Sequence, residues 1–208
     1  SPAYSHLYLC IAVELAAVIC IHDPLRREAR DAVAALHACG IGKVVMMTGD
    51  NRQTAQAVAR EVGVDAVYAE VLPEDKAAFI RSEKAAGRTV IMVGDGVNDS
   101  PALSEADAGV AISTGAAIAR EIADITIASE DLFELVTLRR LSQALMARIH
   151  RNYRFIVGFN LSLILLGVAG LLPPTTSALL HNMSTLGISL KSMTDLGPEL
   201  PSPTPAER

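Results

Sequence analysis

Short apolar runs recur through the first two thirds of the chain, and the segments between them carry apolar residues at helical spacing. The runs predict strands at 7–13, 15–21, 44–47, 89–93, 109–112 and 125–128, the first two forming a hairpin around Glu14. The intervening segments predict helices at 24–38, 52–62, 73–86 and 116–123, with a short helix after Pro101. Strands that alternate with amphipathic helices are typical of an α/β fold with a doubly wound parallel sheet.

The last third of the chain has a different pattern. Residues 132–154 predict one long helix with five arginines, Arg139, Arg140, Arg148, Arg151 and Arg154. Residues 155–190 contain no Asp, Glu, Lys or Arg, and the first apolar run, 155–172, has 18 residues, about the shortest helix that spans a bilayer. Within 155–192 we expect two transmembrane helices, 155–172 and 175–191, separated by a prolyl turn and followed by a disordered tail at 193–208.

Composition narrows the possible partners. The net charge of −5 and the lack of a basic stripe with interleaved aromatic residues argue against a nucleic-acid partner. Cys10, Cys20 and Cys39 are scattered and form no C-x-x-C pair. We therefore expect buried thiols in a reducing compartment, and neither a disulfide framework nor a zinc site.

The most specific motif covers residues 94–103, Gly-Asp-Gly-Val-Asn-Asp-Ser-Pro-Ala-Leu, at the end of a predicted strand. Its carboxylates, Asp95 and Asp99, are four residues apart on a glycine-rich turn, and carboxylate oxygens are ligands that Mg²⁺ prefers. The glycines let the backbone approach a ligand closely. The strand-end position of Asp95 favours metal binding, whereas Asp99 could equally cap the following helix.

Two further positions have the character of a phosphate site. Thr48, Gly49 and Asp50 follow a buried strand, where a hydroxyl and backbone N–H groups can contact phosphate; alternatively, Thr48 and Asp50 only cap the next helix. Lys76 lies in the first turn of a predicted helix, where a cation is unfavourable unless an anion is nearby; alternatively, it is a solvated surface lysine. Because parallel strands end at one edge, residues 48–50 and 94–96 should face one cleft.

Together these motifs resemble the haloacid-dehalogenase-type phosphotransferase core, and within it the P-type ATPases. The resemblance rests on 47–52 (Met-Thr-Gly-Asp-Asn-Arg), on Pro73-x-x-Lys76 and on 94–103, in that order, with Asp-Pro-Leu-Arg at 23–26 upstream. It implies that residues 1–130 are the C-terminal part of an incomplete phosphorylation domain and that 131–154 form a cytoplasmic linking helix.

On the phosphate side, the resemblance implies that Thr48 and Lys76 hold the transferred phosphoryl group. Gly49 and Asp50 would shape the nucleotide side of the site, where ATP binds. Phosphoryl transfer depends mostly on positioning and charge neutralisation, and these residue types provide both.

On the metal side, the resemblance implies that Asp95 ligates Mg²⁺, with Asn98 and Asp99 shaping its surroundings. The departure from the family concerns the nucleophile, because no Asp-Lys-Thr-Gly-Thr run occurs in the sequence. We therefore expect a C-terminal fragment that is inactive alone and needs the missing N-terminal part of the same pump. The alternatives are a phosphatase of the same superfamily with a membrane anchor, and a non-catalytic, degenerate membrane chain.

The apolar segments resemble the transition-metal (type IB) branch of the P-type ATPases, where two helices follow the phosphorylation domain. Asn160, His181, Asn182 and Ser184 are then candidate ligands for the transported ion, together with Thr185. Alternatively, these groups form hydrogen bonds between the helices. Imidazole and amide ligands suit zinc, copper or manganese without distinguishing them.

The distribution of positive charge predicts the orientation in the bilayer. Arginines precede the first apolar helix and Lys191 follows the second, whereas the turn between them is uncharged. The positive-inside rule therefore places the phosphorylation domain and the C-terminal tail in the cytoplasm. The second helix should insert only if His181 and Asn182 find partners, and Asn160 is the candidate.

Overall fold

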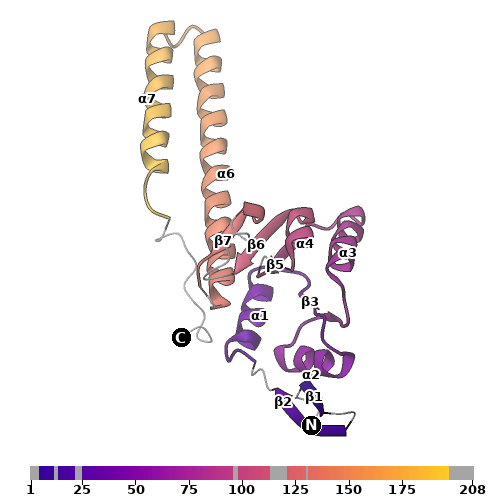
Figure 1. The fold of residues 1–208 in the computed structure, drawn as a ribbon. Helices are drawn as coiled ribbons and strands as arrows, with labels where there is room; N and C mark the ends of the chain where they lie inside the picture. The colour runs from indigo at the N-terminus through magenta and orange to yellow at the C-terminus, as the bar shows by residue number, and fades with distance from the viewer. Residues whose placement is uncertain are drawn as a thin grey trace. The chain divides into compact units, whose positions relative to one another are not determined.

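The computed structural model describes residues 5–11, 14–21, 25–95, 98–112, 121–129 and 131–196, and the side chains of all but 5–7, 20 and 21 among them. The chain divides into two compact units, Ser1–Val136 and Thr137–Arg208, which are described separately below. Figure 1 shows the strands and shorter helices of the first unit and the two long helices of the second.

An antiparallel hairpin begins the first unit. Strand β1 (Ser5–Ile11) pairs with β2 (Glu14–Ile21), with an irregularity between Leu9 and Cys10. The predicted hairpin is confirmed. The expectation that Cys10 is buried is wrong, because a two-stranded hairpin leaves its faces open and this thiol is exposed; Cys39 is buried as expected. The side chain of Cys20 lies outside the described residues.

A small parallel sheet follows the hairpin. Its elements, in chain order, are α1 (Ala29–Ala38), β3 (Val45–Met47), α2 (Arg52–Val62) and β4 (Ala66–Tyr68). β3 and β4 pair in parallel from Val45 and Ala66 onward. The sequence did not predict β4, because three residues are too few to show an alternating pattern. Helix α2 has the predicted bounds and ends at Gly63, whose φ of 80° is the left-handed conformation that favours glycine.

A second parallel sheet has the order β5-β6-β7. Its strands and the helices beside them are α3 (Pro73–Ala85), β5 (Ile91–Gly94), α4 (Ser100–Glu105), β6 (Ala108–Ile112) and β7 (Ile125–Ile127). The parallel α/β architecture is therefore confirmed, although the described parallel strands belong to two sheets and not to one. Most of the predicted helix 116–123 lies outside the described residues.

The same type of stabilising contact occurs at the beginning of each described pair of parallel strands. The carboxylate of Asp65, just before β4, accepts a hydrogen bond from the Val44 N–H at 2.6 Å. Asp107 before β6 and Asp124 before β7 do the same for Val90 and Gly109, each at 2.8 Å. In each case the donor and the aspartate are the residues that immediately precede the first paired residues of the two strands. These three aspartate bridges therefore fix where each strand starts relative to its neighbour.

The core of the first unit contains many small side chains. Ala32, Ala55, Ala102 and Ala111 are fully buried, and the largest buried side chains include those of Ile80, Leu103, Val110 and Val136. Val136 packs with Ala35 of α1 and with Cys39, which follows that helix. Alanine on helices that cover a sheet allows close backbone approach, so the strands and helices pack without large side chains.

Helix α6 (Phe133–Val168) is continuous through position 154, where the sequence placed the boundary between linking and apolar helices. It ends four residues earlier than predicted, followed by Gly170 with φ 73°, and α7 (Pro174–Ser192) returns antiparallel to it. In the second unit, Arg148 donates to the carbonyls of Thr194 and Asp195 at 2.6 and 2.9 Å, and Asn152 donates to Ser192 Oγ at 2.9 Å. These bonds fix the register of the helix pair.

Among the helices that the structure describes, none has both the length and the apolar character needed to cross a membrane.

The aspartate bridges predict a pH-dependent stability. The hydrogen bond from Val90 N–H, assisted by Lys84, lowers the pKa of Asp107. A lowered pKa in the folded state stabilises the fold above the unfolded pKa of about 3.9, and this contribution is lost as the pH falls through the folded value. Asp107→Asn should therefore lower the free energy of unfolding at pH 7, by an amount that shrinks below about pH 4.

Urea unfolding of the two proteins from pH 7 to pH 2.5 measures the difference. The control is Asp31→Asn, which removes an exposed carboxylate on α1, away from the strand starts. A difference between Asp107→Asn and the wild type that stays constant with pH would contradict the bridge as the cause.

Candidate functional site

The predicted site residues lie where two parallel strands end. β3 ends at Met47 and is followed by Thr48, while β5 ends at Gly94 and is followed by Asp95. This agrees with the sequence prediction that both motifs stand at the carboxyl ends of strands. Gly96 and Val97, between Asp95 and Asn98, lie outside the described residues.

Thr48 and Asp50 form a local turn. The Thr48 hydroxyl donates to Asp50 Oδ2 at 2.8 Å and accepts from the Asp50 N–H at 3.1 Å. Asn51, whose Oδ1 accepts from the Thr54 N–H at 3.0 Å, caps α2. The alternative that Thr48 and Asp50 only cap this helix is therefore wrong. Gly49 is exposed between them, so the turn presents a hydroxyl, a carboxylate and backbone to solvent.

An ion pair joins α3 to the loop after β5. Lys76 Nζ donates to Asp99 Oδ1 at 2.7 Å, and the two side chains are only 14% and 13% exposed. The alternative of a solvated surface lysine is therefore wrong. The anion beside Lys76 in this structure is the carboxylate of Asp99, and it offsets the unfavourable position of a cation in the first turn of α3.

Asp99 is held by packing as well as by charge. It occupies the N-cap position of α4, but its side chain makes no capping hydrogen bond, so the capping alternative is wrong. A Cβ atom added to Gly94 would lie 2.5 Å from Asp99 Oδ2, which is closer than real Cβ contacts allow. The glycine at 94 is therefore needed because the Asp99 carboxylate lies against the end of β5.

Asp95 and Asp99 supply the oxygen ligands that Mg²⁺ prefers. Asp95 is exposed directly after β5, and Asp99 Oδ2 lies beside Gly94, whereas Asp99 Oδ1 is bound to Lys76. Within the part of the chain that the structure describes, no group of three or more His, Cys, Asp or Glu side chains could hold a metal ion. The two aspartates therefore fit part of a magnesium shell, with the remaining positions left to water and to other ligands.

The polar residues of the second unit form two kinds of contact. His181 Nδ1 and Asn160 Oδ1 are 2.7 Å apart, which confirms the predicted partnership across the helix pair. Ser184 and Thr185 instead donate to the carbonyl of His181 within α7, at 2.8 and 3.0 Å. Asn182 is exposed. An amide oxygen can only accept, so in this contact the imidazole donates from Nδ1.

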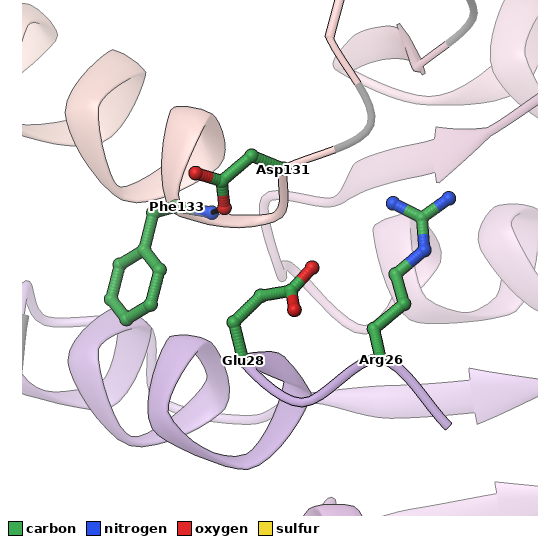
Figure 2. A pocket seen from close by; sticks show the side chains of 4 residues that line it. All are labelled: Arg26, Glu28, Asp131 and Phe133. Carbon is green, nitrogen blue, oxygen red and sulfur yellow. Dashed lines mark hydrogen bonds between the residues drawn. The ribbon is translucent and has the colours of Figure 1, made fainter. Parts of the chain in front are cut away.

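One hollow of the first unit was not predicted from the sequence. Figure 2 shows Arg26 and Glu28, which precede α1, opposite Asp131 and Phe133 at the start of α6. The hollow holds about 360 Å³, and Asp131 Oδ1 accepts from the Phe133 N–H at 2.9 Å. Of its described lining residues, none belongs to the motifs after β3 and β5, so it is a separate feature.

Comparison with known proteins identifies relatives that cover most of the chain. The model of the haloacid dehalogenase-like hydrolase family matches residues 3–107. Copper-transporting ATPase 2 of Rhizobium meliloti (strain 1021) is 46% identical over 176 residues, which are 85% of this chain and 21% of that protein. The copper-exporting P-type ATPase of Staphylococcus aureus (strain JH9) is 41% identical over 182 residues, 88% of this chain and 23% of that protein.

Solved structures give a consistent result. A zinc-transporting PIB-type ATPase in its E2.Pi state has a TM-score of 0.80 and 29% identity, over 93% of this chain and 32% of that one. The catalytic CPx-ATPase domain CopB-B has a TM-score of 0.51 and 29% identity, over 59% of this chain and 48% of that one. The chain therefore spans about a fifth of the length of the curated relatives it matches.

The ion pair between Lys76 and Asp99 predicts strong energetic coupling. Lys76→Met and Asp99→Asn should each lower the free energy of unfolding by about 1–3 kcal/mol, between the values for exposed and buried pairs, because each leaves a partly buried charge without its partner. The double variant should lose less than the sum of the two. Chemical unfolding of all four proteins gives the coupling energy.

The same helices provide a matched control. Arg81 and Glu105 also join α3 to α4, at 3.1 Å, but the arginine side chain is 58% exposed. Their coupling, measured with Arg81→Met and Glu105→Gln, should stay below about 1 kcal/mol. Equal coupling energies for the two pairs would show that burial does not strengthen the Lys76–Asp99 contact.

Proposed function

Because this chain belongs to the haloacid dehalogenase-like hydrolase family, we propose that it forms the C-terminal part of an ATP-driven transition-metal pump. The observation that carries the proposal is the ion pair of Lys76 with Asp99 at the end of β5, beside Asp95. A partly buried cation and two carboxylates at a strand end are what a phosphoryl group with Mg²⁺ requires. The named activities of the copper-transporting relatives support the choice of cargo.

The reaction that we propose transfers the γ-phosphoryl group of ATP to an aspartate outside this chain. The bond from the γ-phosphorus to the bridging oxygen breaks, a bond to the aspartate carboxylate forms, and ADP leaves; water later releases phosphate. The ammonium of Lys76 and the hydroxyl of Thr48 donate to the transferred group, while Gly49 and Asp50 shape the nucleotide side. Bound Mg²⁺, held by Asp95 and Asp99 with Asn98 nearby, would neutralise the phosphate charge.

The edges of β3 and β5 support the proposal that a further strand, outside this chain, completes the site. β3 and β5, the strands that carry the site, each lie at the edge of their own sheet in the described residues. On β5, Ile91 and Val93 are exposed apolar side chains, 46% and 37% accessible, which a buried strand does not normally present. We infer that a strand bearing the acceptor aspartate pairs at these edges.

For the transported ion we propose the polar residues of the helix pair. Asn160 Oδ1 accepts from Nδ1 of the His181 ring and leaves Nε2 for the metal, and a hydrogen bond of this kind commonly orients a metal-binding imidazole. Asn182 and Ser184 lie on the same helix within one turn of His181. Copper, zinc and manganese all fit these ligands.

The membrane location is part of the proposal. Residues 155–190 carry no Asp, Glu, Lys or Arg, and large apolar side chains are exposed along both helices, among them Ile164, Leu165, Leu179 and Leu186. Contiguous exposed apolar surface of this kind is typical of a contact with lipid or with other helices. We infer that this segment lies in the bilayer, with the first unit and the tail in the cytoplasm.

Phosphoenzyme formation tests the catalytic proposal. The isolated chain, given radiolabelled ATP and Mg²⁺, should form no acid-stable, hydroxylamine-sensitive phosphoenzyme, because its acceptor is outside the chain. The complete pump should form it. In that pump, Asp95→Asn should abolish the signal by removing charge from the metal shell, and His181→Ala should raise the metal concentration needed for half-maximal signal.

Asp131→Asn, a change of equal charge at the separate hollow, is the control and should leave the signal intact. Wild-type phosphoenzyme in Asp95→Asn, or phosphorylation of the isolated chain, would refute the proposed roles.

Cysteine accessibility tests the orientation. In the complete pump without native cysteines, Thr175→Cys at the start of α7 and Met193→Cys after its end should react with impermeant reagents from opposite sides of the membrane. Met193 is 83% exposed, so its position suits labelling. Labelling of both from one side would mean that α7 does not span.

A further inference from the structure

The turn at residues 48–50 is held by a short segment that follows β4. The Thr48 N–H continues the β3–β4 ladder by donating to the Tyr68 carbonyl at 3.0 Å. An unbroken parallel ladder would next direct the Glu70 N–H to the Thr48 carbonyl. That carbonyl instead accepts from the Val71 N–H at 3.0 Å, one residue later. Glu70 is therefore an extra residue in the ladder, as in a β-bulge.

The Glu70 N–H has a different acceptor. It donates to the Asp50 carbonyl at 2.9 Å, so the successive N–H groups of Glu70 and Val71 hold the carbonyls on either side of Gly49. A Cβ atom added to Gly49 would lie 3.9 Å from the Val71 carbonyl oxygen, which shows how closely the two segments approach. These two backbone hydrogen bonds, here called the clamp, fix both ends of the turn that carries the Thr48 hydroxyl.

The clamp depends on the backbone conformation of Glu70. The dihedral angles of Glu70 set the direction of its own N–H relative to the N–H of Val71, and a left-handed residue brings two such groups to the same side. Glu70 has a φ of 57°, and no other non-glycine residue in the described part of the chain has a positive φ. This conformation is strained for a residue with a Cβ atom. The Glu70 side chain is exposed, so burial of the side chain does not account for the strain.

The residues that follow the clamp begin helix α3. Leu72 is the N-cap residue; its N–H donates to Asp75 Oδ2 at 3.2 Å, and its carbonyl accepts from the Lys76 N–H at 3.3 Å. The clamp and this helix start are consecutive in the chain. Residues 70–76 therefore connect the Thr48 turn to Lys76, the two groups proposed above to contact the phosphoryl group.

We propose that Glu70 is a positioning residue for phosphoryl transfer, acting through its left-handed backbone and not through its carboxylate. The conformation closes the clamp, and the clamp holds the Thr48 hydroxyl in a fixed place relative to Lys76. The inference rests on the phosphoryl-transfer function proposed above. It adds to the site a residue that lies outside the motifs at 47–52, 73–76 and 94–103.

Substitutions that differ in their tolerance of a positive φ test the inference. In the complete pump, Glu70→Gly and Glu70→Asn should form phosphoenzyme with a single-turnover rate constant within about twofold of the wild type, because both residues adopt the left-handed conformation readily. Glu70→Val should lower that rate constant about tenfold at saturating ATP, because a β-branched residue disfavours the conformation and a displaced contact slows the transfer. Rapid-quench measurement with radiolabelled ATP gives the rate constants.

The rate constant separates positioning from a merely structural role. A variant that only unfolds part of the pump lowers the amount of phosphoenzyme but leaves the rate constant of the folded fraction unchanged. Glu70→Gln removes the charge and keeps the length of the side chain, so it should stay within about threefold of the wild type. A loss in Glu70→Gly and Glu70→Gln as large as in Glu70→Val would show that the carboxylate acts, and would overturn the proposal.

Glu61 provides a matched control, because it is an exposed glutamate within helix α2. In thermal unfolding of the full chain, Glu61→Gly should melt below Glu61→Val, since glycine is the poorer helix former. At position 70 the order should reverse, with Glu70→Gly melting above Glu70→Val. Both Glu61 variants should keep the wild-type rate constant.

The remaining outcomes separate this inference from the proposed function. A wild-type rate constant in Glu70→Val, or the same order of melting temperatures at positions 61 and 70, would overturn the positioning role and leave phosphoryl transfer intact. Absence of phosphoenzyme in the wild-type complete pump would overturn the proposed function, and the role of Glu70 with it.

Discussion

Three aspartate carboxylates each receive a backbone N–H from the neighbouring segment just before parallel pairing begins. Asp65, Asp107 and Asp124 extend the register of their strands by one step, so a charged side chain starts a ladder that backbone groups continue. A charge-assisted bond at this point resists slippage, and a slip by one residue would turn every side chain of a strand to the other face. The strand ends, and with them the motifs that follow β3 and β5, take their positions from these contacts.

In the loop after β5, the position of Asp99 depends on where that strand ends. Asp99 packs on Gly94 and binds Lys76, so one carboxylate connects the strand end, the start of α4 and the first turn of α3. Asp95 stands next to this contact and is exposed. A rigid, charged strand end beside an exposed carboxylate is the arrangement that a phosphate and a cation require, because little reorganisation remains when they bind.

Much of this could be predicted because local signals were strong. Gly63 ends α2 where predicted, and the hairpin, the parallel strands and the strand-end placement of Thr48 and Asp95 follow from the apolar pattern. Asn160 and His181 could be paired in advance because few polar groups interrupt the apolar helices. The Lys76–Asp99 contact could not, since it joins residues 23 apart whose local alternatives were equally plausible. β4 is too short for periodicity, and α6 shows no break because nothing between Arg154 and Phe155 disfavours a helix.

Two glycines of the second sheet, Gly94 and Gly109, have no room for a Cβ atom, but the atoms that crowd them differ. At Gly94 the neighbour is a side chain, so a larger residue there becomes compatible with the fold when position 99 also changes; the two sites are epistatic. At Gly109 an added Cβ would lie 2.6 Å from the backbone carbonyl oxygen of Leu103, and no substitution at 103 removes that atom. Paired changes at 94 and 99 can therefore preserve the fold, whereas a larger residue at 109 requires the backbone around position 103 to move.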